Sequence, residues 1–134
     1  MEARTDPLGV LISSDAKAVD RKKLAELLAP FVAIDRETNE FAFTAGFEEV
    51  GGNDLKIELV LASAKARALL FDQPDGMSPS QIMDLGIMAD GSVKTSLKRL
   101  FDGRKVRKDK EGRYVIPPHR ITDLSKRLSN RSEA

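Results

Sequence analysis

Cysteine is absent from the 134 residues of the chain, and histidine occurs only once, at position 119. The lack of cysteine excludes a disulfide framework, a thiolate zinc site and a cysteine nucleophile, and a single histidine excludes a multi-histidine metal centre. No apolar run approaches the ~20 residues of a membrane-spanning helix, and the acidic N-terminus lacks the pattern of a signal peptide. We therefore expect one cytoplasmic domain, with or without an appended element, and no metal, cofactor or membrane.

The chain also lacks a large net charge, because it has 22 Lys and Arg residues and 21 Asp and Glu residues. The charges are nevertheless separated along the chain. Nine basic against 16 acidic residues give −7 over residues 1–93, and nine against three give +6 over residues 94–113. This asymmetry indicates a polyanionic partner, of which nucleic acid is the commonest. The alternative is a solvated basic surface that offsets the acidic part of the chain.

The beginning of the chain predicts a flexible arm followed by a short helix. Residues 1–18 contain proline, glycine and serine around one apolar run, Leu8–Ile12. Such a terminal segment is poorly ordered unless it pairs with something else. Asp20 is placed to cap a helix over residues 21–29, whose leucines form a single apolar stripe. Pro30 stops this helix.

Two short apolar runs follow, at residues 31–34 and 41–44, and a polar loop separates them. Their β-branched and aromatic residues predict a strand, a loop and a second strand. The glycines from Gly46 to Gly52 then mark a break in regular structure. We interpret residues 19–52 as an extension made of a helix and a β-hairpin.

The longest helical pattern runs from residue 53 to residue 70, and Asn53 or Asp54 is placed to cap it. Its apolar residues recur at helical spacing on two separate stripes. They are Leu55, Leu59, Ala62, Ala66 and Leu69 on the first, and Ile57, Leu61, Ala64 and Ala68 on the second. Two stripes indicate burial on both sides, so we expect a central helix.

The next segment predicts two helices joined by a turn. Ser78 as cap and Pro79 in the first helical position begin a short helix that ends at Gly86. A turn leads to a second helix over residues 91–102, which Asp90 or Ser92 is placed to cap. Its inner face carries Val93, Leu97 and Leu100 with Phe101 beside them, and its outer face carries Lys94, Thr95, Lys98 and Arg99.

A basic hairpin and a last helix complete the pattern. Residues 104–116 alternate as two short strands around a turn, with Val106, Tyr114 and Ile116 facing inward. Residues 119–129 then predict an amphipathic helix, whose stripe consists of Ile121, Leu124 and Leu128.

Helix, helix, turn, helix and basic hairpin is the element order of a winged helix-turn-helix domain. Met77-Ser-Pro-Ser-Gln-Ile, Ser92-Val-Lys-Thr-Ser-Leu-Lys-Arg-Leu and the stretch from Val106 to Gly112-Arg-Tyr-Val-Ile116 resemble that superfamily. With the central helix, the resemblance covers residues 53–116. It implies an α+β, mainly α fold in which residues 53–118 form the winged helix-turn-helix domain. Residues 119–134 would be a C-terminal helix and tail.

The resemblance also implies how such a domain would bind DNA. Helix 91–102 would lie in the major groove, and the wing, residues 104–116, would contact phosphates. The residues that match DNA-contacting positions are Ser92, Lys94, Thr95, Lys98, Arg99, Arg104, Lys108, Lys110 and Arg113. Whether Lys94 or Thr95 reads the bases stays open, and Arg99 is expected at the DNA backbone. The wing residues would meet phosphate or the minor groove.

We therefore expect a sequence-specific double-stranded DNA-binding protein, a transcriptional regulator that is nucleoid-associated if prokaryotic. It is expected not to be an enzyme, because no nucleophile has a partner base and His119, after two prolines, lacks triad surroundings. The alternative is a winged-helix adaptor that binds protein in a larger assembly, since a fold does not fix a function. A homodimer through residues 21–44 or 119–129 is also expected, unless these apolar stripes pack onto their own domain.

Overall fold

The computed structural model describes residues 21–133 of the chain, with side chains up to Leu128. The arm expected over residues 1–18 and the cap expected at Asp20 lie outside the described residues. The elements are α3 (Arg21–Leu28), β1 (Val32–Ile34), β2 (Phe41–Phe43), α4 (Ala45–Glu48), α5 (Asn53–Phe71), α6 (Pro79–Asp84), α7 (Asp90–Asp102), β3 (Arg107–Lys108), β4 (Tyr114–Val115) and α8 (Pro118–Glu133). The fold is therefore mainly helical, with two small antiparallel hairpins.

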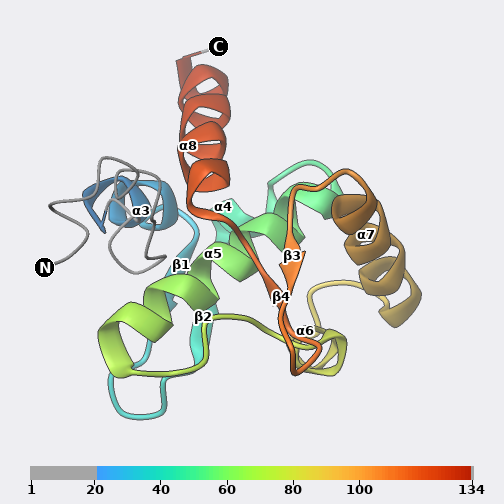
Figure 1. Cartoon of the computed structure of the whole chain (residues 1–134). Coiled ribbons are helices and arrows are strands. Elements are labelled where there is room, and N and C mark those ends of the chain that lie inside the picture. Colours follow the sequence, from blue (N-terminus) through green and yellow to red (C-terminus); the bar gives the residue numbers. More distant parts are fainter. Residues whose placement is uncertain (1–20, 134) are drawn as a thin grey trace, which may run out of the picture.

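Helix α5 is the centre of the fold and crosses the molecule between the α3–α8 pair and α7 (Figure 1). Every residue from Ile57 to Lys65 is buried, which confirms the central helix that the two apolar stripes predict. The expected cap is wrong, however. The N-cap residue is Gly52, at φ +94°, and no side chain caps the helix. Asn53 and Asp54 lie within the first turn instead.

The break expected around the glycines contains one additional helical turn, α4. Its N-cap is Thr44, whose hydroxyl accepts from the Phe47 backbone N–H at 3.4 Å and donates to the Pro30 carbonyl at 2.6 Å. Phe47 is buried and packs on Phe43, with the two ring centroids 4.4 Å apart. The turn thus fixes an aromatic side chain in the core. The sequence does not predict this turn, because four residues are too few to show a helical period.

The first hairpin confirms the predicted strand, loop and strand. Strands β1 and β2 are antiparallel, with Val32 opposite Phe43 and Ile34 opposite Phe41. The Asp35 carboxylate closes the loop by accepting from the backbone N–H groups of Thr38 at 2.9 Å and Glu37 at 2.8 Å. These hydrogen bonds lower the pKa of Asp35, because they stabilise its charged form.

Helices α3 and α8 pack against each other, and α3 also packs on α5 (Figure 1). The stripe of α3, which is Leu24, Leu27 and Leu28, is buried, and so are Ile121 and Leu124 of α8. The apolar stripes that made residues 21–44 and 119–129 candidates for a dimer contact are therefore covered within the chain. Helix α8 also continues beyond residue 129, where the predicted helix ends.

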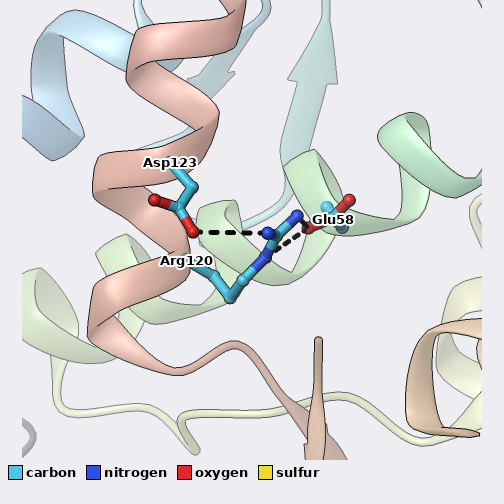
Figure 2. A network of polar contacts seen from close by, with 3 residues as sticks. All are labelled: Glu58, Arg120 and Asp123. Carbon is cyan, nitrogen blue, oxygen red and sulfur yellow. Dashed lines mark hydrogen bonds and ion pairs between the residues drawn. The ribbon is translucent and has the colours of Figure 1, made fainter. Parts of the chain in front are cut away.

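Two buried charges of α5 have partners on neighbouring segments. Glu58 accepts from Arg120 of α8 at 2.7 Å (Nη2) and 3.2 Å (Nε), and Arg120 also contacts Asp123 at 3.4 Å (Figure 2). Seven residues further along α5, Lys65 pairs with Asp75 at 2.9 Å. The side chains of Glu58 and Lys65 are each 2% exposed. Because seven residues are about two helical turns, both charges lie on one side of α5.

Candidate nucleic-acid interface

Helix α6 begins as its sequence predicts. The Ser78 hydroxyl accepts from the Gln81 backbone N–H at 3.2 Å, and the Gln81 side chain accepts from the Ser78 backbone N–H at 2.9 Å. This reciprocal pair is a capping box, and Pro79 occupies the first turn, where its missing N–H is not needed. Ile82 is fully buried, and Gly86, at φ +68°, ends the segment. The start of this short helix is confirmed, and the helix ends at Asp84, two residues before the predicted Gly86.

Helix α7 presents the outer and inner faces that its sequence predicts. Val93, Leu97 and Leu100 are buried. The cap is wrong: Ala89 is the N-cap residue, no side chain caps the helix, and Asp90 and Ser92 both lie within the first turn. The backbone hydrogen bond from Val93 to the Ala89 carbonyl, at 3.1 Å, already begins the helical pattern there.

The outer face of α7 is exposed at Lys94, Thr95, Lys98 and Arg99, while Ser92 is half-buried. Lys98 lies 3.4 Å from Asp102, one turn further along the helix, and both side chains are largely in solvent. Among the residues that the structure describes, Lys94 has no ion-pair partner. Its ammonium and the hydroxyl of Thr95 are therefore available to a ligand.

Arg99 makes a contact that no local sequence pattern indicates. Its Nε and Nη2 donate to the two carboxylate oxygens of Asp54, in the first turn of α5, at 2.7 and 2.9 Å. The pKa of Asp54 is lowered, chiefly by the hydrogen bond from Arg99, with further contributions from Ser96 and from the charge of Lys105. The same pair raises the pKa of Arg99. The contact joins α7 to α5, so Arg99 positions the helix.

The end of α7 turns the chain toward the second hairpin. The Lys105 N–H donates to the Leu100 carbonyl at 2.9 Å, and the Arg104 N–H donates to the Phe101 carbonyl at 3.0 Å. These two bonds form a Schellman motif, whose left-handed residue is Arg104 at φ +60°. Glycine is the usual residue there, because a Cβ atom is unfavourable in this conformation. The backbone of Arg104 is thus fixed between α7 and the hairpin, while its side chain is exposed.

The second hairpin pairs β3 with β4, with Arg107 opposite Val115 and Lys108 opposite Tyr114. Its tip is held by Asp109, whose carboxylate accepts from the backbone N–H groups of Glu111 at 3.0 Å and Arg113 at 2.9 Å. Arg113 also lies 3.8 Å from the Asp109 carboxylate, and Lys110 is exposed at the tip. The hairpin is therefore short, has a tip closed by Asp109, and carries basic side chains.

A third segment extends this hairpin. Met77, between α5 and α6, bridges to Tyr114, with its N–H 3.1 Å from the Tyr114 carbonyl and the reciprocal bond at 2.8 Å. A Cβ atom on the preceding residue, Gly76, would lie 2.5 Å from the Tyr114 carbonyl oxygen. The close approach of the two backbones therefore requires glycine.

An aromatic contact connects α7 to the hairpin. Phe101 is 44% exposed, and its ring meets that of Tyr114 edge to face, with centroids 6.1 Å apart. The Lys108 ammonium lies 5.5 Å from the centroid of the same Tyr114 ring. Phe101, expected beside the buried face of α7, instead lies at the surface between α7 and β4.

Helix α7 and the β3–β4 hairpin lie near each other (Figure 1), and both carry exposed basic side chains. Of the nine residues that match DNA-contacting positions, seven are exposed; Ser92 and Arg113 are half-buried. Lys105 and Arg107 are also exposed and basic, although the resemblance does not assign them a contact. Both lie within the +6 segment of the sequence.

Within residues 21–133, no cluster of three or more His, Asp or Glu side chains is arranged to hold a metal ion. In the same part of the chain, no helix has the length and apolar character needed to cross a bilayer.

Comparison of the chain with protein-family models, with curated proteins and with solved structures found no match.

Proposed function

We propose that the protein binds double-stranded DNA in a sequence-specific manner, as a winged helix-turn-helix transcriptional regulator. The observation that carries this proposal is the grouping of α5, α6 and α7 with a basic hairpin whose strand β4 also pairs with Met77. A short capped helix, a turn and an amphipathic helix with a basic outer face suit insertion of the second helix into the major groove. The hairpin beside it supplies cations for the sugar–phosphate backbone.

The outer face of α7 supplies the base contacts in this proposal. Lys94 and Thr95 lie in the N-terminal half of the helix, are exposed and have side chains that donate to or accept from base edges. Lys98 follows one turn later and reaches phosphate once its weak, solvated pairing with Asp102 opens. Arg99 stays on Asp54 and keeps α7 in position.

The wing in this proposal is the β3–β4 hairpin. Its tip is held by backbone hydrogen bonds from Glu111 and Arg113 to the Asp109 carboxylate, and it carries the exposed Lys110. Arg104 and Lys108 precede this tip, between α7 and Asp109. Such cations set the affinity and the salt dependence of binding, because each phosphate contact releases condensed counterions. Sequence selection would come from α7.

Fluorescence anisotropy on a mixed-sequence duplex, at two salt concentrations, tests the proposal. Replacing Lys94 and Lys98 with alanine is expected to weaken binding on the order of five- to tenfold for each lysine. The slope of log K against log salt is expected to fall by about one for each phosphate contact that is lost.

The matched control replaces two exposed lysines outside this face, Lys22 of α3 and Lys126 of α8, with alanine. It removes the same charge and is expected to change affinity much less. Equal losses for both pairs would contradict the assignment of the face. If micromolar protein showed no salt-sensitive binding, the DNA proposal would fail and the protein-binding adaptor would replace it.

A further inference from the structure

An open apolar groove lies between α3 and the C-terminal half of α5. Arg21, Leu24 and Ala25 line it from α3, and Ala66, Leu69 and Leu70 line it from α5; its volume is about 160 Å³. Leu70 is 61% exposed, the larger of the two exposures recorded for large hydrophobic residues in the described chain. The groove therefore offers a small apolar surface that is open to solvent.

We propose that this groove binds the apolar run Leu8–Ile12 of the same chain. The run, Leu-Gly-Val-Leu-Ile, contains four branched aliphatic residues. A cavity of about 150 Å³ accommodates benzene, so a groove of this size takes one or two such side chains. The run is thus matched to the groove in both chemistry and size.

The path of the chain supports this occupant. The described chain begins at Arg21, and Arg21 is itself a lining residue, whose guanidinium donates to the Leu69 carbonyl at 3.5 Å. Eight residues separate Ile12 from Arg21, and eight extended residues reach about 26 to 29 Å. The run therefore has enough chain to fold back onto the groove from which α3 departs.

Connectivity favours the chain's own run over the run of a second copy, whereas charge complementarity suits both equally. Asp6 and Asp15 flank the run, while α3 begins with the exposed cations Arg21 and Lys22. A segment tied by a short linker has an effective concentration on the order of millimolar. At micromolar protein, a segment from another molecule competes poorly with it.

The groove is separate from the proposed DNA face. It lies at the C-terminal end of α5, whereas the Asp54–Arg99 contact lies at the N-terminal end. The 19 residues of α5 correspond to about 28 Å of helix. Binding of the run would hold α3 on α5, and it does not depend on DNA binding.

Methyl NMR of the full chain tests the proposal. In a uniformly labelled sample at micromolar concentration, nuclear Overhauser contacts are expected between methyl groups of Leu8, Val10, Leu11 or Ile12 and those of Leu69 or Leu70. In a mixture of labelled and unlabelled copies filtered for intermolecular contacts, the same signals are expected to vanish. Their persistence would assign the groove to a second copy, and their absence from both samples would leave it unoccupied by the run; either result overturns the proposal.

Variants provide a second readout. Leu11→Asp is expected to abolish the contacts and to lower Tm by about 3 to 5 °C, because a carboxylate is not stable in an apolar groove. Ser13→Asp adds the same charge just outside the run and is the matched control. Leu70→Ser changes the groove side at an exposed position and should also remove the contacts. Equal effects of Leu11→Asp and Ser13→Asp would overturn the proposal.

Discussion

Charged side chains at the middle of α5 and charged side chains on α7 have very different surroundings. Glu58 and Lys65 are buried, each with an oppositely charged partner, while Lys94 and Lys98 of α7 point into solvent. A buried charge without its partner is costly, whereas an exposed charge is stable alone. The first group therefore joins segments of the fold, and the second remains free to meet a ligand.

The largest expected effect comes from breaking the buried pair in Figure 2. Glu58→Ala leaves the guanidinium of Arg120, only 12% exposed, with Asp123 as its remaining acidic contact. We expect the free energy of unfolding to fall by about 3 to 5 kcal/mol, measured by urea denaturation. The double variant Glu58→Leu/Arg120→Met removes both charges and is expected to recover most of this loss. A loss below about 1 kcal/mol for the single variant would contradict the structural role of the pair.

The next effect concerns the segment that links α5 to the β3–β4 hairpin. Gly76→Ala places a Cβ atom 2.5 Å from the Tyr114 carbonyl oxygen, so the Met77–Tyr114 pairing must open or shift. We expect a loss of about 1 to 3 kcal/mol and faster hydrogen exchange at the Tyr114 amide. Gly91→Ala is the matched control, since nothing lies within 4 Å of its added Cβ. It is expected to be neutral or to stabilise α7, and equal losses would contradict the close approach.

A smaller effect is expected at the exposed pair between α5 and α7. Asp54→Asn is expected to cost less than about 1 kcal/mol, because solvent screens the Asp54–Arg99 pair. The depressed pKa of Asp54 means that its stabilisation is fully present above the ordinary value of 3.8 and is lost as pH falls through the folded-state pKa. The free energy of unfolding should therefore differ less between pH 7 and pH 2 in the variant than in the unmodified protein. An unchanged difference would contradict the assignment.

The smallest effect is expected at Arg104, where substitutions separate the cost of the backbone conformation from the loss of a cation. Arg104→Gly relieves the left-handed backbone at φ +60° and should stabilise the protein by about 0.5 to 1 kcal/mol relative to Arg104→Ala. Both variants lose the same cation, so both are expected to weaken DNA binding equally. Thermal unfolding and anisotropy measure the two effects. An equal Tm for the alanine and glycine variants would contradict the stability cost assigned to the left-handed backbone at this position.

Sequence patterns predicted the periodic elements well and the caps of α5 and α7 poorly. The apolar spacing of α5 and α7, and Ser78 followed by Pro79 at the start of α6, lead to the observed helices. Asn53, Asp54, Asp90 and Ser92 all favour capping, yet none of them caps. At these positions Gly52 and Ala89 adopt the cap conformation, so the better-suited residues enter the first turn. Several adjacent capping residues compete, and local propensity does not decide between them.

The basic face was predictable because nine basic residues lie within one short segment and the helical period places several of them opposite the apolar stripe. The contacts that position this face were not. Arg99 and Asp54 are 45 residues apart in sequence, and Glu58 and Arg120 are 62 apart. Neither the period of a helix nor the composition of a segment indicates a contact between residues so far apart in the sequence. For this reason the sequence around Arg99 suggests a phosphate ligand, whereas its contacts are those of a positioning residue.

The amino-acid sequence by itself determined the order of the elements, the apolar stripes, the need for a central helix and the separation of acidic and basic segments. These properties follow from the spacing of residue types along the chain and require no knowledge of distant neighbours. Only the tertiary structure decided that the stripes of α3 and α8 cover each other, that Met77 joins β4, and that α5 carries buried ion pairs. These features depend on which surfaces meet after folding, because burial and charge compensation are properties of contacts between segments.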